Sequence, residues 1–360
     1  MNRLIVGASD KHKLLLQLLA DDFSRGVLLI DPTGDLARGA ANIVPLEWTY
    51  QTLYLDPADI EHPIGFNILE NVAGQVARDK LTRDICAYFD ALFPEGPTTL
   101  ARSNSNFILA NCLRVLLDTP GATMLGILKL LTDRPYRAAC LANCTDPVVL
   151  RNWSVIEGWD HRQSQAAMAP LQNKIGTLLM SPVIRNIVGQ THSTFSLEKG
   201  KIIIANLDTA KLGDTTARLL GSLLIARSAG TVYINDLAFF ATDHLATLLL
   251  QERLTVSLNF LAELRHAPVL RDALLSIAEK YVFRTNLADA KELAFYLGIL
   301  NPRVLTELDA LPYGLEEIQP PPSLNRLKAI KKRSRAAHTR PRKTVEEAIE
   351  HYLSEKRWLL

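Results

Sequence analysis

The sequence has 360 residues, of which 48% are hydrophobic and 22% charged, and its formal net charge is +2. This balance excludes a disordered or fibrous chain and allows a large core with room for two domains. No apolar run reaches the roughly 20 residues that cross a bilayer, and Met1-Asn2-Arg3 leads directly into a strand-like run rather than a signal peptide. We therefore expect a cytoplasmic protein without a membrane segment.

The first seventy residues alternate short apolar runs with polar loops and one amphipathic stretch. The runs predict strands at Leu4–Val6, Val27–Ile30 and Thr52–Leu55, and a helix is expected at about 13–23. Short, continuously apolar strands that alternate with helices indicate a parallel sheet that is covered on both faces.

The segment after the first strand has the order of an altered phosphate-binding loop. An intact loop, G-x-x-x-x-G-K-[ST], holds phosphates with backbone N–H groups, a helix N-terminus and its lysine, while the hydroxyl binds Mg²⁺. Aligned from Gly7, the chain keeps the lysine as Lys13 but has His12 for the second glycine and Leu14 for the hydroxyl residue. Leucine cannot bind magnesium, and the Cβ of a histidine makes a left-handed turn costly. An ordinary strand–loop–helix is the alternative interpretation of this segment alone.

Residues 72–190 change character, because helical periodicity dominates and strand signals are nearly absent. We predict an all-α insertion with helices near residues 74–93, 103–118, 123–131, 134–143, 147–157, 162–180 and 182–188.

The α/β pattern returns after residue 200. Strands are predicted at Lys201–Asn206, Thr231–Ile234, Leu254–Leu258 and Lys280–Arg284, and helices at Thr215–Ser228 and Ala288–Leu297. Gln319-Pro320-Pro321-Pro322 marks a boundary, and Thr344-Val345-Glu346-Glu347 is a capping box that predicts a last helix at about 345–357.

These patterns predict an α/β fold with a mostly parallel sheet. The core comes in two parts, 1–71 and 191–318, which are interrupted by the all-α insertion at 72–190. A basic tail with a terminal helix follows at 319–360.

The tail carries a strong concentration of positive charge. Residues 323–343 contain nine basic side chains and no acid, whereas the last seventeen residues contain four glutamates and two basic residues, which leaves −5 for residues 1–322. One interpretation is a solvated, disordered extension. The other is contact with a phosphate backbone through Arg326, Lys328, Lys331, Lys332, Arg333, Arg335, Arg340, Arg342 and Lys343.

The order of these segments resembles the HerA–FtsK superfamily of P-loop ATPases, in particular the TraG/TraD-like coupling ATPases of conjugation and type IV secretion. The segments that carry the resemblance are Asp31-Pro32-Thr33-Gly34-Asp35, His62-Pro63-Ile64-Gly65-Phe66-Asn67, the stretch 200–224 and Phe283-Arg284 with Asp289-Ala290. The resemblance covers roughly residues 1–310 and implies a RecA-like core.

The resemblance also implies roles for residues at three strand ends. Gly7, Lys11, His12, Lys13 and Leu14 fall in the nucleotide-binding segment. The Asp-Glu pair that serves magnesium and the attacking water in active relatives is Asn235-Asp236 here, and the γ-phosphate-sensing glutamine corresponds to Asn259. The catalytic positions are thus Asp236 and Asn259, and the metal positions Asn235 and Asp236, all of them altered.

ATP and Mg²⁺ are the cofactors that the resemblance implies, and the altered residues predict that both bind weakly or not at all. Three functions stay open. The first is an inactive ATPase-derived subunit of a DNA-processing or conjugative DNA-transfer system, with DNA, an active ATPase or further copies in a homo-oligomeric ring as its partners. The second is an active, atypical ATP-driven DNA translocase. The third is a protein-interaction module that keeps only the ATPase fold.

Overall fold

The computed structural model describes residues 2–7, 11–93, 99–250 and 253–354. The chain forms two compact units. Unit 1 contains Met1–Asp56 and Leu197–Ala337, and unit 2 contains Pro57–Ser196 and His338–Leu360. No helix among the described residues combines the length and apolarity needed to cross a bilayer.

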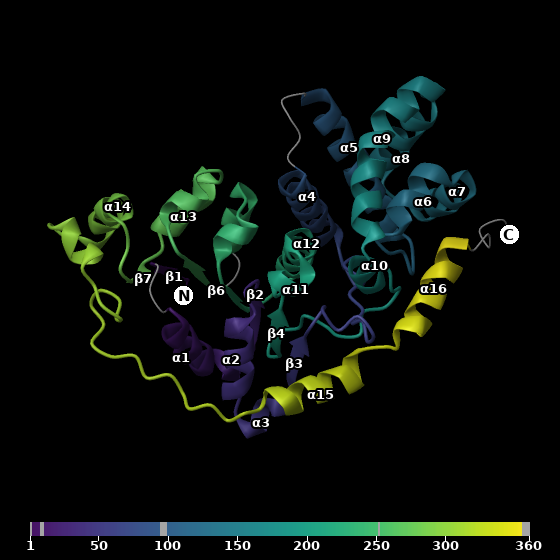
Figure 1. The fold of residues 1–360 in the computed structure, drawn as a ribbon. Helices are drawn as coiled ribbons and strands as arrows, with labels where there is room; N and C mark the ends of the chain where they lie inside the picture. The colour runs from purple at the N-terminus through teal and green to yellow at the C-terminus, as the bar shows by residue number, and fades with distance from the viewer. Residues whose placement is uncertain (1, 8–10, 94–98, 251–252, 355–360) are drawn as a thin grey trace. The chain divides into compact units, whose positions relative to one another are not determined.

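Unit 1 is built on a parallel sheet of seven strands, in the order β3-β4-β2-β5-β6-β1-β7 (Figure 1). The strands are β1 (Arg3–Val6), β2 (Val27–Asp31), β3 (Thr52–Leu55), β4 (Ile202–Asn206), β5 (Thr231–Ile234), β6 (Arg253–Leu258) and β7 (Glu279–Val282). Every residue of β2, β3, β4 and β5 is buried, as expected of parallel strands covered on both faces. The sequence-based prediction of an α/β fold with a parallel sheet is therefore confirmed.

Helices cover both faces of this sheet (Figure 1). The α-helices of unit 1 are α1 (His12–Asp22), α2 (Asp35–Ile43), α3 (Leu46–Thr49), α11 (Thr209–Leu212), α12 (Asp214–Ala226), α13 (Pro268–Leu275), α14 (Leu287–Leu297) and α15 (Leu327–His338, in this unit up to Ala337). Short 3₁₀ helices are η1 (Phe23–Arg25), η2 (Leu237–Phe240), η3 (Asp243–Leu250), η4 (Leu261–Leu264) and η5 (Pro302–Thr306). The leucines of α1 and the alanines of α2 pack on Ile5, Leu29 and Ile204 of the sheet.

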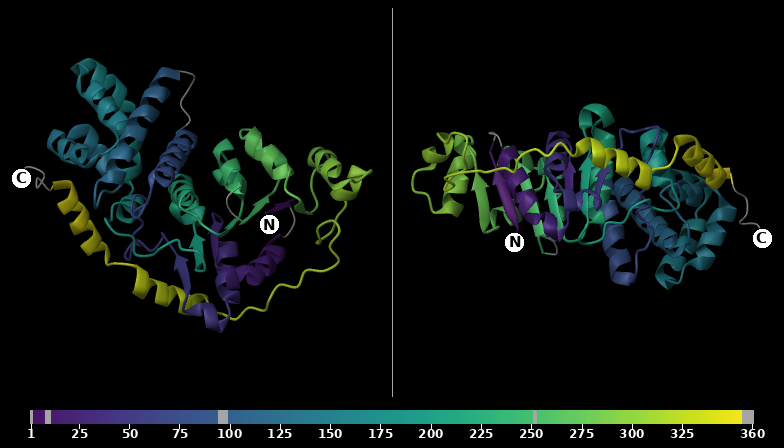
Figure 2. Two further views of the ribbon diagram at one scale, coloured as in Figure 1. Left: turned by 180° about the vertical axis from the view of Figure 1, so that it is seen from behind. Right: turned by 90° about the horizontal axis from the view of Figure 1, so that it is seen from below.

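Helix α15 covers the edge of the sheet at β3, and the sequence did not predict this helix. The extended chain before it crosses α1 and α2 (Figure 2), where Gln319 N donates to Gln17 Oε1 and Leu324 N to Asn42 O. Ser334 Oγ then accepts a hydrogen bond of 2.9 Å from the backbone N–H of Tyr54, and Ile330 is fully buried. The helix thus covers an edge strand and bonds one of its backbone N–H groups, which would otherwise be available for pairing with another chain.

The regular secondary structure of unit 2 is helical in its described residues, apart from a single bridge between Ile64 and Thr339. The helices are α4 (Gln75–Leu92), α5 (Thr99–Asp118), α6 (Gly126–Thr132), α7 (Arg134–Asn143), α8 (Pro147–Glu157), α9 (His161–Met180), α10 (Pro182–Val188) and α16 (Arg342–Ser354). Asp133, Asp146 and Asp160 begin three of them, each accepting hydrogen bonds from first-turn N–H groups.

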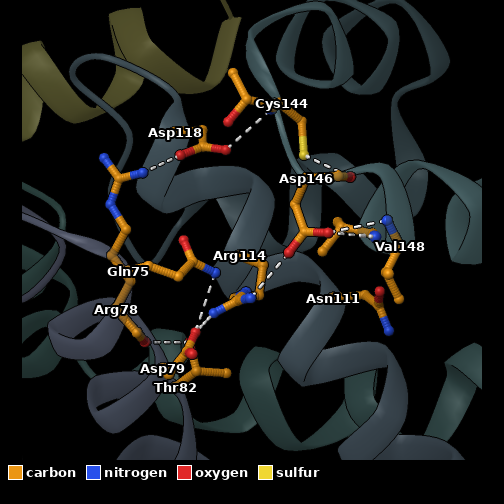
Figure 3. A network of polar contacts seen from close by, with 12 residues as sticks. Gln75, Arg78, Asp79, Thr82, Asn111, Arg114, Asp118, Cys144, Asp146 and Val148 are labelled. Carbon is orange, nitrogen blue, oxygen red and sulfur yellow. Dashed lines mark hydrogen bonds and ion pairs between the residues drawn. The ribbon is translucent and has the colours of Figure 1, made fainter.

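A network of ion pairs joins three of these helices (Figure 3). Arg114 of α5 pairs with Asp79 of α4 and with Asp146 at the start of α8, the latter over 2.9 Å. Arg78 of α4 pairs with Asp118 at the end of α5. The network explains the polar residues on the facing sides of these helices.

The C-terminal segment differs from its prediction in two respects. Residues 327–354 form two helices, so the interpretation of this part as a disordered extension is wrong. The last helix begins at Arg342 rather than near 345, because Val345 N already donates to Pro341 O and places Thr344 of the expected capping box inside the helix. The predicted end at 357 lies outside the described residues.

Candidate functional site

The carboxyl ends of four neighbouring strands of unit 1 bring polar residues to one edge of the sheet. Asp31 ends β2, Asn235-Asp236 follow β5, Asn259 follows β6 and Gly7 follows β1. Ligands of open parallel sheets bind at this edge. The end of β1 and the Asn235-Asp236 pair therefore lie at the same edge of the sheet, although β6 lies between β5 and β1.

A cavity of about 210 Å³ lies at this edge. It is lined by Lys11, His12, Leu15, Thr33, Leu36, Asn235, Asp236 and Asn259.

Lys11 is the cation of the cavity. It immediately precedes α1, and its Nζ donates to Leu258 O over 2.7 Å and to Asn259 Oδ1 over 2.8 Å. Burial lowers the pKa of Lys11 to about 8, and the nearby carboxylates of Asp236 and Glu263 oppose this effect only in part. Glu263 was not predicted from the sequence; its Oε2 accepts from the backbone N–H groups of Asn259 and Phe260.

Asn235 and Asp236 have different surroundings. The Asn235 side chain is engaged on both sides, because Oδ1 accepts from Ser257 Oγ over 2.8 Å and Nδ2 donates to Asp31 Oδ1 over 2.9 Å. Asp236 adopts a left-handed conformation with φ 53°, and its backbone N–H donates to Ser257 Oγ. Burial, followed by the repulsion from Glu263, raises the pKa of Asp236.

The Asp31-Pro32-Thr33-Gly34-Asp35 segment begins α2. Asp31 accepts from Thr33 N and Thr33 Oγ1 through Oδ1, and from Ala37 N through Oδ2. Gly34 has φ 80°, and a Cβ there would come within 2.7 Å of Asn206 Oδ1. The segment therefore needs its aspartate and glycine for local structure, and its Thr33 lines the cavity, a role that the sequence analysis missed.

The residues predicted to bind nucleotide separate into two groups. Lys11 and His12 line the cavity. Lys13 is exposed and does not line it, and Leu14 is 2% exposed within the hydrophobic core. His12 is the first helical residue of α1, so its Cβ meets no left-handed strain, contrary to expectation. Gly7 lies at the end of β1, where its N–H donates to Leu258 O.

The lowered pKa of Lys11 predicts a pH dependence of stability. Between pH 8 and pH 10 the unfolded chain keeps the lysine proton and the folded chain loses it, so the free energy of unfolding rises with pH in this window. We expect a rise on the order of 1–3 kcal/mol. Urea unfolding at several pH values should show it for the wild type, whereas Lys11→Met should lack this component. If the free energy of unfolding changed with pH in the same way for wild type and Lys11→Met, the pH dependence would not come from Lys11.

The nine predicted nucleic-acid residues also separate. Several of them interact with other residues of the protein: Lys331 Nζ is 2.6 Å from Asp56 Oδ2, Arg333 lies over the ring of Tyr50, Arg342 pairs with Glu61 and Glu346, and Lys343 Nζ is 3.9 Å from Glu347 Oε1. Lys328, Lys332 and Arg335 are exposed and share one face of α15, because they are four and three residues apart. Arg326 is half-buried, and Arg340 and Lys343 are exposed.

The seven-stranded parallel sheet, with its cavity at the carboxyl edge, has a RecA-like α/β fold. Solved structures share this fold. The plasmid coupling protein TrwB, in complex with a non-hydrolysable GTP analogue, superposes with a TM-score of 0.59 at 16% identity, over 90% of this chain and 87% of that one. TrwB with ADP and Mg²⁺ gives 0.58 at 15% identity, over 90% and 87%. VirB4 of Thermoanaerobacter pseudethanolicus gives 0.53 at 12% identity, over 86% and 84%. No family model and no curated protein matches the sequence.

Proposed function

We propose that this chain is an ATPase-like subunit of a DNA-processing or conjugative DNA-transfer system, and that it does not hydrolyse ATP. One observation carries the proposal. The chain keeps the fold of a coupling protein and a lysine, Lys11, in its sheet-edge cavity. The residue that follows this lysine, where the motif has its magnesium-binding hydroxyl, is His12, and Leu14, the hydroxyl position in the alignment from Gly7, is buried in the core.

The cavity offers fewer magnesium ligands than an intact site. The ion prefers near-octahedral oxygen ligation, usually with one or two carboxylates and substrate phosphates. Leu14 has no oxygen, and Asn235 Oδ1 already accepts a hydrogen bond from Ser257, which leaves Asp236 as the carboxylate on the cavity wall. Within the residues that the structure describes, no group of three or more His, Cys, Asp and Glu side chains could hold a metal ion.

The same cavity fits a phosphate group better. The N-terminus of α1, an eleven-residue helix, begins at the cavity, and Lys11 supplies a positive charge there. Backbone N–H groups and the helix dipole favour an anion at such a position. The experiment that tests the proposal measures phosphate release from Mg²⁺-ATP with and without DNA. We expect background rates in both cases, and DNA-stimulated release would instead support an active translocase.

DNA contact is proposed through the exposed face of α15. Replacing Lys328, Lys332 and Arg335 together with glutamine should weaken DNA binding. It should also make the slope of log K against log salt concentration less steep by about 2–3, since each contacted phosphate of duplex DNA contributes about 0.9 to this slope. Fluorescence anisotropy at several salt concentrations measures both quantities.

The matched control removes three exposed charges elsewhere in unit 1, by the substitutions Lys199→Gln, Lys211→Gln and Arg303→Gln. This variant has the same net charge as the first and should bind DNA much more tightly. Equal losses in the two variants would show that only net charge matters and that α15 is not a DNA-binding surface.

A further inference from the structure

The surroundings of Lys11 indicate how an anion is held in the cavity when the magnesium ligands are lacking. We propose that the Lys11 ammonium takes the place of a divalent cation, so that the cavity binds the phosphate chain of a nucleotide or polyphosphate without magnesium. The inference rests on the proposed function and adds to it the ligand chemistry of the site.

Hydrogen-bond acceptors at the end of β6, the strand between β5 and β1 in the sheet, fix the position of the ammonium. Leu258 O and Asn259 Oδ1, at the end of β6, accept two hydrogen bonds from Lys11 Nζ. Asn259 is itself held, since Glu263 Oε2 accepts from its backbone N–H over 3.3 Å. The cation therefore stands at a defined place on the cavity wall.

The ammonium keeps capacity for a ligand. An ammonium has three N–H donors, and Lys11 uses two of them in its hydrogen bonds within the described residues. Because the side chain lines the cavity, the third donor can meet an oxygen of a bound phosphate. Charge-assisted hydrogen bonds of this kind are about twice as strong as neutral ones.

The negative charges near Lys11 also resemble those near a bound metal cation. Asp236 and Glu263 both interact attractively with Lys11, and Asp236 lines the same cavity. Without a cation, a phosphate chain in the cavity would be repelled by the carboxylate of Asp236. With Lys11 in place, a positive charge and the N-terminus of α1 offset this repulsion.

The helix register explains why this lysine, rather than the one in the motif, serves the site. Lys11 and Leu15 are four residues apart and both line the cavity, whereas Lys13 is exposed to solvent. The two lysines thus form a matched pair for experiment, with equal charge and with side chains that begin two residues apart.

The test is calorimetric titration of the full chain with ATP and, separately, with inorganic tripolyphosphate, each in EDTA and in excess Mg²⁺. We expect affinities in EDTA at least as high as those in Mg²⁺. Lys11→Met should lose about 10- to 100-fold in affinity, the equivalent of one charged hydrogen bond, whereas Lys13→Met should change little. Similar binding of ATP and tripolyphosphate would place recognition in the phosphate chain, and tighter binding of ATP would identify a nucleotide as the ligand.

A second variant covers the case in which Lys11→Met does not fold. Asn259→Asp keeps an acceptor for Lys11 but adds a negative charge beside the cavity, so it should weaken anion binding at least about 10-fold. Binding that requires Mg²⁺, the absence of binding in both buffers, or equal losses in Lys11→Met and Lys13→Met would each overturn the inference. These results concern binding and not hydrolysis. The proposed function is contradicted by a different result, which is magnesium-dependent phosphate release.

Discussion

Replacing Gly7 with alanine is expected to destabilise the protein by about 3–5 kcal/mol, which combines backbone strain with overpacking. Gly7 has φ 134°, and a Cβ built there lies 2.6 Å from Phe283 Cβ and 2.9 Å from the Phe283 backbone carbonyl carbon. The clash involves backbone as well as side chain, so it cannot be relieved by a rotamer change. Urea unfolding measures the loss.

Gly176→Ala is the matched control for this prediction. Gly176 lies within α9, and a Cβ there has no neighbour within 4 Å among the described residues. Alanine at an open helical position should be neutral or stabilise by up to about 1 kcal/mol. If Gly7→Ala were equally harmless, the close packing of β1 against the chain after β7 would be incorrect.

Replacing Leu14 with threonine, the residue type of an intact phosphate-binding loop, is expected to cost about 2–4 kcal/mol in folding free energy. The reason is the position of the side chain, which is 2% exposed and packs in the core of unit 1. A threonine would leave a gap and bury a hydroxyl there. Unfolding experiments should show this loss, and calorimetry should find no gain in magnesium-dependent nucleotide binding.

Lys13→Thr serves as the control, because the neighbouring residue is exposed and its replacement should cost no more than about 0.5–1 kcal/mol. A stable Leu14→Thr protein that gained magnesium-dependent binding would mean that position 14 faces the cavity. Restoring the motif residue by residue would then be a sensible route to activity, which the present geometry argues against.

The strands of unit 1 could be predicted from sequence because the sheet is buried on both faces. The strands Ile202–Asn206 and Val27–Asp31 are continuously buried. Their unbroken apolar runs could therefore be recognised as strands without knowing which strands pair with them. Helix α15 could not be predicted in the same way. Its buried residues are Ile330 and Ser334, and the contacts that place it are to β3, nearly 300 residues earlier in the chain.

The candidate site was predicted in outline and differed in detail. Asn235, Asp236 and Asn259 do line one cavity, since parallel strands end at a common edge. The motif alignment selected Lys13, yet the side chain that reaches the cavity is that of Lys11. Residue counting fixes the order of a motif, but the start of α1 at His12 decides which side chains face the cavity and which, like Leu14, face the core.

The absence of hydrolysis is the central claim, and phosphate release from saturating Mg²⁺-ATP tests it most directly. The wild type, Lys11→Met and Asp236→Asn should all release phosphate at the background rate, because neither His12, which follows the cavity lysine, nor the buried Leu14 carries a magnesium-binding hydroxyl, and the two substituted groups have no turnover to lose. Magnesium-dependent release by the wild type that Lys11→Met abolishes would contradict the account and identify an active ATPase.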